Sequence, residues 1–418
     1  MRPNIKSEYL QSARPSSATE NLVLVINSGS SSLKFALFDA GEAPIRLWSG
    51  SIERIGMELG RFHARGEDST DATDSSLRVP DHETALTHLL DEIEKGSLAS
   101  QLIAVGHRVV HGGPDCHGPE VVTPELEEQL RQLIPLAPLH QPHNLAAIQA
   151  VRKARPDLVQ VACFDTAFHQ SLPVTAQLTG LPRRFFDDGI RRYGFHGLSY
   201  EYITTALRQS DVDVDHERII VAHLGNGASM CALRGGKSVE TTMGFSALAG
   251  LPMGTRCGDL DAGIVLYLLS EYGMTAGQVQ NLLYEESGLL GLSGLSRNME
   301  DLLASENEPK AAEAIAFFCY RARAHLMSLT AALGGVDRII FTGGIGANAF
   351  EIRQRICEGL SYIGVQIDSH RNAIGQRVIS PVHANVVVEA WETNEEIVIA
   401  RHVHEVLADQ SLRKEIGA

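Results

Sequence analysis

Two segments of the chain share one pattern, in which an apolar run meets a turn of small residues and then resumes. Leu22–Ile26 is an unbroken apolar run, and Leu33–Phe38 follows the turn Asn27–Ser32. The segment Arg218–Leu233 repeats this design around Gly225–Gly227. Apolar runs of this length around glycine- and serine-rich turns predict β-hairpins. One hairpin in each half of the chain predicts a duplicated architecture with related domains.

The remaining pattern alternates between buried strands and helices. Short apolar runs predict strands at Ile103–Arg108, Leu158–Phe164, Arg338–Phe341 and Val386–Glu389. Length and apolar spacing predict helices at His82–Lys95, Pro124–Leu133, His143–Arg155, Ala262–Tyr272, Pro309–Leu333, Ala349–Gly359 and Glu395–Val406. The acidic segment His63–Ser76 is interpreted as a surface loop. This alternation predicts an α/β fold.

Length and charge narrow the class of protein. A chain of 418 residues is longer than one core usually supports, so we expect two domains with a ligand cleft between them. The formal net charge of −15 argues against nucleic-acid or anionic membrane surfaces, which call for basic patches. An anionic substrate would therefore need a local cluster of Arg, Lys and backbone N–H groups.

The sequence also predicts where the protein resides. The six cysteines form no C-x-x-C pair, which is typical of reduced thiols in the cytosol. Residues 1–20 contain no apolar core run, so we expect a flexible tail there and not a secretory signal or an anchor. No apolar stretch approaches the ~18–20 residues that span a bilayer. We expect a cytoplasmic enzyme without a membrane partner.

Three glycine-containing turns are candidate phosphate sites. In Asn27–Lys34, glycine and three serines let consecutive backbone N–H groups approach a phosphate, although the Gly-Lys-Ser/Thr ending of a Walker A loop is missing. The turn His223–Gly227 has the same capability. The segment Gly343–Asn348 follows a predicted strand as a glycine-rich loop. An ordinary hairpin turn is the alternative for each of the first two.

Charged residues at strand ends indicate the reaction class. Arg108 and Arg256 are flanked by glycines, and a guanidinium fork suits carboxylate or phosphoryl oxygens. Asp165 follows a predicted strand, at the end where α/β proteins bind ligands, with a helix N-cap as its alternative role. The 17 histidines include no three with convergent metal-ligand spacing. His196 is interpreted as a donor to a phosphoryl oxygen, with a buried core histidine as the alternative.

Nine segments combine these residues in one order along the chain. They are VLVINSGSSSLKF (23–35), GHRVVHGG (106–113), LAPLHQPHN (136–144), CFDTAFHQSLP (163–173), RRYGFHG (191–197), HLGNGAS (223–229), MGTRCGDLD (253–261), FTGGIGANAF (341–350) and TNEE (393–396). Together they closely resemble the acetate kinase family, from about residue 22 to residue 406.

The resemblance implies a fold and an assembly. The family belongs to the acetate and sugar kinase, Hsp70 and actin superfamily, with two related domains of the actin-like ATPase (ribonuclease H-like) type around a nucleotide cleft. It implies an acyl-kinase domain at residues 21–165 plus 394–418 and a nucleotide-binding domain at residues 166–393. Family members are typically homodimers.

The resemblance also implies the site residues. Those implied at the reacting centre are Arg108, Asp165, His196 and Arg256, with the acyl pocket at Arg108, Val110, Leu139, Phe195 and Ala247. Those implied for the nucleotide are Ser30, Ser32, Lys34, His140, His223, Leu224, Gly225, Asn226, Gly227, Asn298, Met299, Glu300, Gly343, Gly344, Ile345, Gly346, Ala347 and Asn348. Asn27 and Glu395 would lie near Mg²⁺, with Mn²⁺ as an alternative ion.

Several positions depart from the family pattern. Ala247 stands where the family commonly has Pro, which would enlarge the acyl pocket toward propionate. Asn298 and Glu300 stand where Asp and Arg are usual, and Ala347 replaces a Glu. These three changes fall around the adenosine site. At the histidine segment, Leu198 and Tyr200 replace the usual Thr and His, and Gln141 replaces an Asn in the preceding loop.

The expected reaction is reversible, Mg²⁺-dependent transfer of the ATP γ-phosphoryl group to acetate, giving acetyl phosphate and ADP. Positioning and electrostatic stabilisation carry most of the catalysis of such a transfer. Three alternatives stay open: a propionate or butyrate kinase, an acyl kinase using GTP or pyrophosphate, and a nucleotide-binding switch like Hsp70 or actin. The paired arginines favour an acyl acceptor over the last of these.

Overall fold

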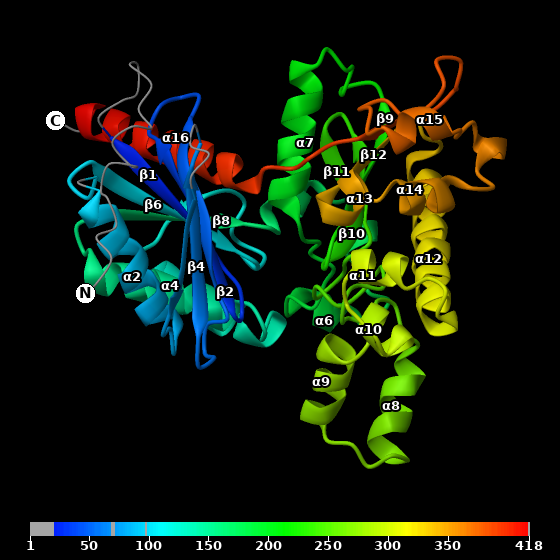
Figure 1. The fold of residues 1–418 in the computed structure, drawn as a ribbon, viewed down its shortest axis with the longest axis horizontal. Coiled ribbons are helices and arrows are strands. Elements are labelled where there is room, and N and C mark those ends of the chain that lie inside the picture. Colours follow the sequence, from blue (N-terminus) through cyan, green and yellow to red (C-terminus); the bar gives the residue numbers. More distant parts are fainter. Residues whose placement is uncertain (1–20, 68–71, 97, 417–418) are drawn as a thin grey trace. The chain divides into compact units, whose positions relative to one another are not determined.

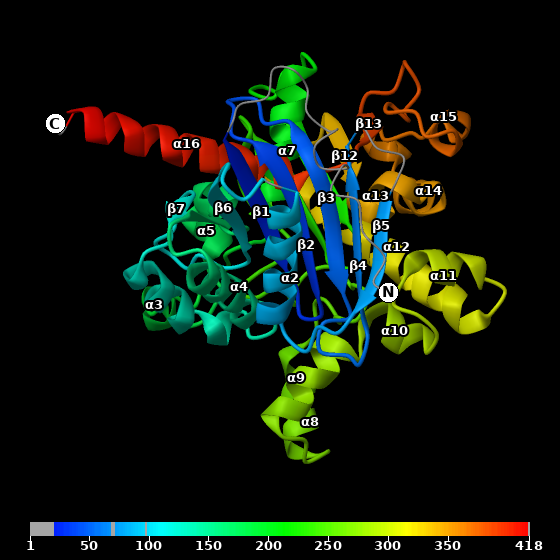
Figure 2. The same ribbon diagram turned by 60° about the vertical axis from the view of Figure 1, so that its left-hand side comes forward.

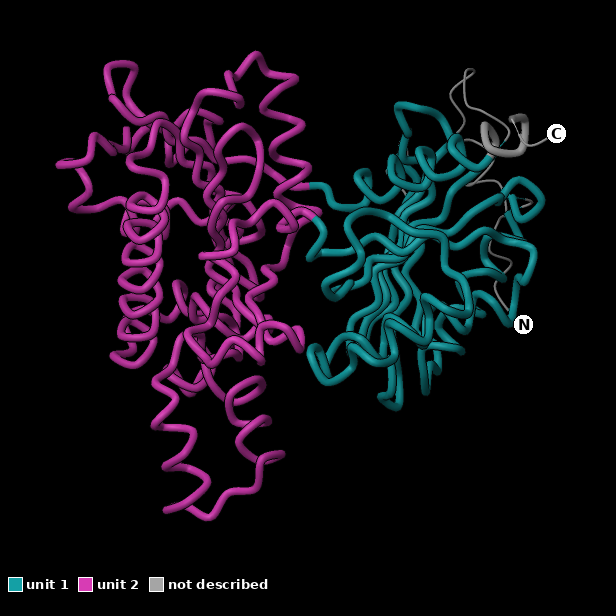
Figure 3. The backbone as a smooth tube through the Cα atoms, turned by 180° about the vertical axis from the view of Figure 1, so that it is seen from behind, with its two compact units in different colours: residues 1–167, 394–418 teal, residues 168–393 magenta. Residues whose placement is uncertain are grey.

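The computed structural model describes residues 21–67, 72–96 and 98–416, so the tail predicted at residues 1–20 lies outside the described residues. The chain divides into two compact units (Figure 3). Unit 1 comprises the described residues up to Ala167 together with those from Asn394, and unit 2 comprises Phe168–Thr393. The C-terminal helix therefore belongs to the same unit as the first hairpin.

Unit 1 is built on an eight-stranded sheet with the order β5-β4-β3-β2-β1-β6-β8-β7 (Figures 1 and 2). The strands are β1 (Leu22–Ser28), β2 (Ser32–Asp39), β3 (Arg46–Glu53), β4 (Gly60–Gly66), β5 (Ala72–Leu77), β6 (Leu102–Val109), β7 (Glu120–Val121) and β8 (Val159–Phe164). Strands β1 to β5 pair antiparallel, whereas β1, β6 and β8 are parallel.

Helices cover both faces of this sheet. They are α2 (His82–Lys95), α3 (Pro124–Gln132), α4 (Gln141–Ala154) and α16 (Glu395–Ile416), with a 3₁₀ turn at Ile134–Leu136. Helix α2 begins where Asp81 caps the N–H of Thr84, and its apolar residues recur at helical spacing on one face. That face packs with β1 and β2 in a core of aliphatic and aromatic side chains.

Helix α16 packs closely on strand β6. A β-carbon added to Gly106 would lie 2.5 Å from Ile399 Cγ2 and 2.8 Å from Val403 Cγ2. Only glycine leaves room for this approach. The close contact fixes the first turn of α16, which carries Glu395, against the sheet.

Unit 2 is built on a five-stranded sheet with the order β11-β10-β9-β12-β13. The strands are β9 (Arg218–Leu224), β10 (Ala228–Arg234), β11 (Lys237–Thr241), β12 (Arg338–Thr342) and β13 (Val387–Ala390). Three antiparallel strands are followed by two parallel ones, as in β3-β2-β1-β6-β8 of unit 1. The duplication predicted from the two hairpins is therefore confirmed in the strand order.

The helices of unit 2 lie beside this sheet and below it in Figure 1. They are α5 (Val174–Gln177), α6 (Arg183–Asp187), α7 (Gly197–Gln209), α8 (Ala262–Ser270), α9 (Ala276–Glu285), α10 (Gly288–Ser293), α11 (Met299–Ala304), α12 (Pro309–Leu333), α13 (Gly343–Asn348), α14 (Phe350–Cys357) and α15 (Ser369–Ala373). Two 3₁₀ turns lie at Ala167–Ser171 and Ser361–Ile363. Long helix α12 packs on β10 and β9.

Two local predictions were wrong. The segment His63–Ser76, expected as a loop, contributes to β4 and β5, and cross-strand contacts such as that of Arg61 with Asp74 accommodate its acidic residues. The segment Gly343–Asn348, expected as a glycine-rich loop, forms the short helix α13. Gly343 adopts φ 76°, and this left-handed conformation turns the chain from β12 into that helix.

Candidate active site

Strand register brings several predicted residues of unit 1 to one face of the sheet. Asn27 pairs with Lys34 across the first hairpin, so their side chains share a face. Ile26 pairs with His107, and alternation then directs the following residues, Asn27 and Arg108, to the opposite face. That face is the one covered by α16. Polar residues of β1, β2 and β6 therefore lie on the face of the sheet that packs against α16.

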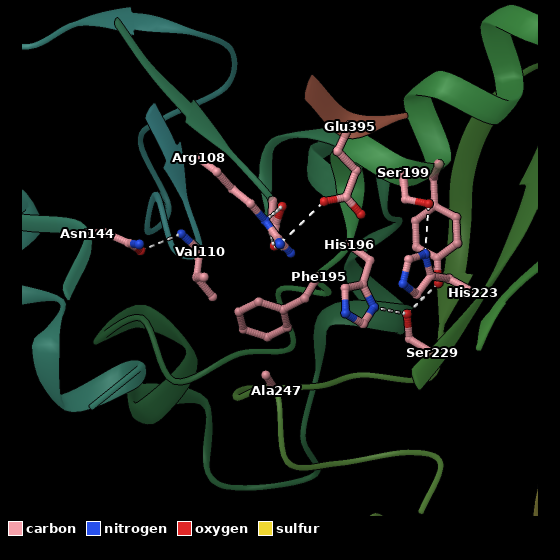
Figure 4. A network of polar contacts seen from close by, with 12 residues as sticks. Arg108, Val110, Asn144, Phe195, His196, Ser199, His223, Ser229, Ala247 and Glu395 are labelled. Carbon is pink, nitrogen blue, oxygen red and sulfur yellow. Dashed lines mark hydrogen bonds and ion pairs between the residues drawn. The ribbon is translucent and has the colours of Figure 1, made fainter. Parts of the chain in front are cut away.

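Arg108 joins two carboxylates in unit 1 (Figure 4). Its Nη2 donates to Asp165 Oδ2 at 2.6 Å and its Nε to Oδ1 at 3.1 Å, while Nη1 lies 3.3 Å from Glu395 Oε2. The Asp165 side chain is only 2% exposed. Burial opposes the charge on Arg108, but the nearby Asp165 and Glu395 outweigh it, so its pKa lies above the ordinary value. The guanidinium is a fixed, permanently charged group.

Two hydrogen bonds fix the tip of the first hairpin, one within the turn and one from a side chain of α2. Gly29 N–H donates to the Ser32 carbonyl at 2.8 Å, and His82 Nε2 donates to the Gly29 carbonyl at 2.7 Å. Ser30 and Lys34 are exposed at this turn. His82 was not among the predicted site residues, because its role depends on packing of α2 beside the turn.

Asn144 links the first hairpin to the strand end that carries Arg108. Its Nδ2 donates to the Ser28 carbonyl at 3.2 Å, and its Oδ1 accepts from Val110 N–H at 3.1 Å (Figure 4). The side chain is buried. Sequence reasoning missed this residue, although it lies in the family-like segment LAPLHQPHN. Leu139 and His140, predicted for the acyl pocket and the nucleotide, are half-buried just before α4.

In unit 2, two predicted side chains converge on one predicted backbone position. A β-carbon added to Gly227 would lie 3.1 Å from His196 Nε2 and 3.5 Å from Arg256 Nη2. Arg256 Nη1 also donates to the Ala247 carbonyl at 2.7 Å. An imidazole nitrogen, a guanidinium and a side-chain-free turn therefore line one small space, an arrangement suited to an anion.

The imidazole of His196 is stacked on that of His223. Their ring centroids are 4.4 Å apart and the planes differ by 23°. His196 Nδ1 is hydrogen-bonded to Ser229 Oγ at 2.8 Å, and His223 Nδ1 to Ser199 Oγ at 2.8 Å (Figure 4). Neither serine was predicted as a site residue. Helix α7, which presents Ser199, was not predicted, and the predicted second hairpin gave no sign that Ser229 would contact His196.

Helix α13 approaches the second glycine turn closely. A β-carbon at Gly343 would lie 2.7 Å from the Leu224 carbonyl, so the backbone of α13 rests on the end of β9. The C-terminal end of α13 is held by buried Arg353, whose Nη1 donates to the carbonyls of Gly346 and Ala347. The two glycine segments predicted from sequence thus lie side by side.

A cavity of about 700 Å³ opens beside these glycines within unit 2. Eight predicted nucleotide residues line it: Gly225, Asn226, Asn298, Met299, Glu300, Gly344, Ile345 and Asn348. Asp301, Leu303, Ala349, Phe350 and Glu351 also line it and were not predicted. The exposed ring of Phe350 is the one signal that could have indicated a ligand surface. The described lining contains carboxylates but neither Lys nor Arg, so it suits the uncharged part of a ligand.

Buried histidines elsewhere are neutral. Burial lowers the pKa of His107, His111 and His169 to about 4. His107 contacts Gln160, and His169 contacts Ser238. Within residues 21–67, 72–96 and 98–416, no group of three or more His, Cys, Asp or Glu side chains could hold a metal ion. No helix in this described part is long and apolar enough to cross a membrane.

Two sheets that share one strand order, each with a glycine turn at its first hairpin, define a protein of the actin-like ATPase fold class. A model of the acetokinase family matches residues 22–401. The chain belongs to the acetokinase family, and the resemblance found in the nine segments is confirmed.

Relatives and solved structures agree with this assignment. The acetate kinase of Rhodopseudomonas palustris strain TIE-1 is 50% identical over 394 residues, covering 92% of this chain and 98% of its own. The crystal structure of Porphyromonas gingivalis acetate kinase is 34% identical with a TM-score of 0.83, covering 93% of this chain and 100% of its own. A Francisella tularensis propionate kinase is 33% identical with a TM-score of 0.86, covering 91% and 98% respectively.

Proposed function

We propose that the chain is an acetate kinase that reversibly transfers the γ-phosphoryl group of ATP to acetate. An acetate oxygen forms a bond to the γ-phosphorus, the bond from that phosphorus to the oxygen it shares with the β-phosphate breaks, and acetyl phosphate and ADP leave. The observation that carries the proposal is the convergence of His196 Nε2 and Arg256 Nη2 on Gly227. High identity to relatives named acetate kinase supports acetate as the acceptor.

The chemical difficulty is that a carboxylate must approach a polyanion. Arg256 would neutralise oxygens of the transferring group, and His196 would donate a hydrogen bond to one of them. The open backbone at Gly227 leaves room for that group beside both side chains. A carboxylate nucleophile has no proton to lose, so the reaction needs no general base.

In unit 1, Arg108 would bind the carboxylate or a phosphoryl oxygen while Asp165 fixes its orientation. The bidentate contact between them holds the guanidinium in one plane. Ser30, Ser32 and Lys34 would contact phosphates from the first hairpin, where Ser30 and Lys34 are exposed. Val110 and Leu139 would line the acyl pocket on this unit.

Glu395 and Asn27 would hold Mg²⁺. This ion prefers oxygen ligands and usually takes one or two protein carboxylates together with substrate phosphates, so a cluster of three acidic side chains is not required. When bound, it neutralises phosphate charge. The position of Glu395 in the first turn of α16, next to Arg108, supports this assignment. Mn²⁺ is an alternative with similar ligands.

The 700 Å³ cavity in unit 2 would take the nucleoside of ATP. Glu300, Asp301 and Glu351 line it, and their charge would repel phosphates, which are therefore directed toward the glycine turn. The exposed ring of Phe350 offers a surface for the base. A cavity of this kind favours a nucleotide over inorganic pyrophosphate, which would leave it empty.

A hydroxamate assay for acyl phosphate tests the function. Acetate, propionate and butyrate are each supplied with ATP, GTP or pyrophosphate. We expect the highest kcat/KM with acetate and ATP, and a lower but measurable value with propionate. Nucleotide hydrolysis without any acyl phosphate would instead support a nucleotide-binding switch, and turnover with pyrophosphate alone would contradict the role of the cavity.

Ala247→Val should narrow the acyl pocket. The Ala247 side chain lies beside Phe195 (Figure 4), and its carbonyl is fixed by Arg256. One methylene in an apolar pocket changes kcat/KM by about 10- to 200-fold, so the propionate-to-acetate ratio should fall at least tenfold. The same ratio measured for Ala312→Val on α12 should not change. An unchanged ratio in Ala247→Val would remove Ala247 from the pocket.

The chain would act as a homodimer. Helices α8 and α12 of unit 2 expose large apolar side chains, which mark protein contacts: Ile264, Leu266, Tyr267, Leu269, Phe317 and Tyr320. Leu266→Glu with Tyr320→Glu should therefore give a monomer by sedimentation velocity. Val382→Glu, at a residue 87% exposed in a loop, should leave the dimer intact. A monomeric unsubstituted protein would contradict the proposal.

We also assign the protein to the cytoplasm, where its nucleotide substrate is available. None of the six cysteines forms a disulfide in the structure, and burial raises the pKa of Cys231 and Cys357 to about 12. Reduced, unreactive thiols are typical of that compartment.

A further inference from the structure

Two histidine–serine hydrogen bonds join the N-terminal end of helix α7 to the β9–β10 strand pair. His196, immediately before α7, bonds to Ser229 of β10, while Ser199 of α7 bonds to His223 of β9. His223 and Ser229 are direct partners in the antiparallel register. A third helical residue, Tyr200, adds its hydroxyl to Ser229 Oγ. The imidazole of His196 is therefore connected through one serine to a tyrosine.

These groups are withdrawn from water. Tyr200 and Ser229 are fully buried, and His196 is 9% exposed. His196 also adopts φ 59° and ψ 26°, a left-handed conformation that is costly for a residue with a side chain. Strain of this kind persists only where surrounding contacts hold the residue, and the bond to Ser229 is one of them.

Chemistry sets the direction of the hydrogen bonds. A phenol is a stronger acid than an aliphatic alcohol, so the Tyr200 hydroxyl donates to Ser229 Oγ. Ser229 has a single proton, and this proton is then directed to His196 Nδ1. A neutral imidazole that accepts at Nδ1 carries its proton on Nε2.

The Nε2 proton of His196 lies beside Gly227, where the proposed function places an oxygen of the transferring phosphoryl group. Nε2 of His196 lies 3.1 Å from the position of a β-carbon added to Gly227, and Arg256 Nη2 lies 3.5 Å from the same position. The neutral form is further favoured because His223 is stacked 4.4 Å away, and two imidazolium rings at that distance would repel each other.

We propose that Tyr200, acting through Ser229, is a positioning residue that fixes His196 as the neutral Nε2–H tautomer, ready to donate to the transferring phosphoryl group. We call the two hydrogen bonds from Tyr200 to Ser229 and from Ser229 to His196 the relay. The donor role of His196 rests on the proposed function, whereas the relay and the tautomer do not. The relay supplies no atoms to the reaction. It ensures that the donor is aimed correctly before substrates bind.

The tautomer is measured directly on the full-length protein. Two-dimensional ¹H–¹⁵N spectra of ¹⁵N-histidine-labelled protein, assigned with His196→Gln, distinguish a protonated Nε2 from a protonated Nδ1. We expect the Nε2–H form in the absence of substrates. A protonated Nδ1, or a doubly protonated ring at neutral pH, would overturn the proposal whether or not the protein makes acyl phosphate.

Variants test the relay. Tyr200→Phe removes one hydroxyl and should lower kcat about five- to tenfold, the effect of one neutral hydrogen bond, with little change in KM for either substrate. Ser229→Ala should lower kcat at least as much, and the double variant should be no slower than Ser229→Ala alone. In both single variants the Nδ1-protonated form should appear in the spectra.

Tyr202→Phe is the matched control, since this tyrosine lies on the same helix and only packs partly buried against the core. Its kcat and tautomer should equal those of the unsubstituted protein. Multiplicative losses in the double variant would overturn the relay, as would an unchanged tautomer in Tyr200→Phe. If Tyr200→Phe does not fold, Ser229→Ala and the spectrum of the unsubstituted protein still decide the question.

Discussion

Replacing Arg256 with alanine is expected to lower kcat by about 10²- to 10³-fold, the usual cost of losing one donor to transition-state charge. Arg256 Nη2 lies beside Gly227 and His196 Nε2, where the transferring group would be held. KM for ATP should change much less, because the proposed nucleoside cavity is lined by other residues. The measurement is steady-state kinetics with acetate and ATP varied separately.

Arg208→Ala serves as the control for this experiment. Arg208 is an exposed arginine of the same unit that pairs with Asp215. Its replacement should leave kcat unchanged, and both variants should keep the circular dichroism spectrum of the unsubstituted protein. Turnover of Arg256→Ala within a few-fold of the original would refute the role assigned to this guanidinium.

Replacing Arg108 with alanine is expected to lower both activity and stability. The buried Asp165 carboxylate would lose its ion pair with the Arg108 guanidinium, and breaking a buried pair in this way typically costs about 3–5 kcal/mol of unfolding free energy. Catalysis should fall by at least the 10²-fold expected for one lost donor. Urea unfolding followed by tryptophan fluorescence measures the first effect, and the hydroxamate assay measures the second.

A second substitution separates the two effects. In Arg108→Ala with Asp165→Asn the buried charge is gone, so much of the stability should return while activity stays low. Arg61→Ala, which breaks an exposed ion pair with Asp74 in the same unit, should leave the unfolding midpoint unchanged. Recovery of activity in the double variant would show that Arg108 acts only through stability.

The helices and strands predicted correctly were those whose own residues show a clear apolar pattern. The hairpin around Asn27–Ser32 and the long helix at Pro309–Leu333 were predicted nearly to their bounds, because each buries its own apolar residues. Strands β3 to β5 were missed, because polar and small residues interrupt their apolar pattern and because their formation depends on pairing with neighbouring strands. The helical form of Gly343–Asn348 was missed because glycine has little helical preference of its own.

The candidate site likewise contains residues that the sequence indicated and residues that it did not. The sequence indicated Arg108, Asp165, His196 and Arg256 because charged and imidazole groups beside glycines or at strand ends stand out in their own segments. Partners such as Asn144 and Ser229 have no such local signal. Their importance comes from contacts across 116 and 33 residues of chain, respectively.

By itself, the sequence determined the α/β class, the duplicated hairpins, the family and the residue types available for phosphoryl transfer. These follow from local patterns and from segments matched in order along the chain. Only the tertiary structure decided which atoms meet: that Arg108 joins Asp165 and Glu395, and that Tyr200 and Ser229 orient His196. The physical reason is that hydrogen bonds and ion pairs act over about 3 Å, and only folding brings residues distant in the chain that close.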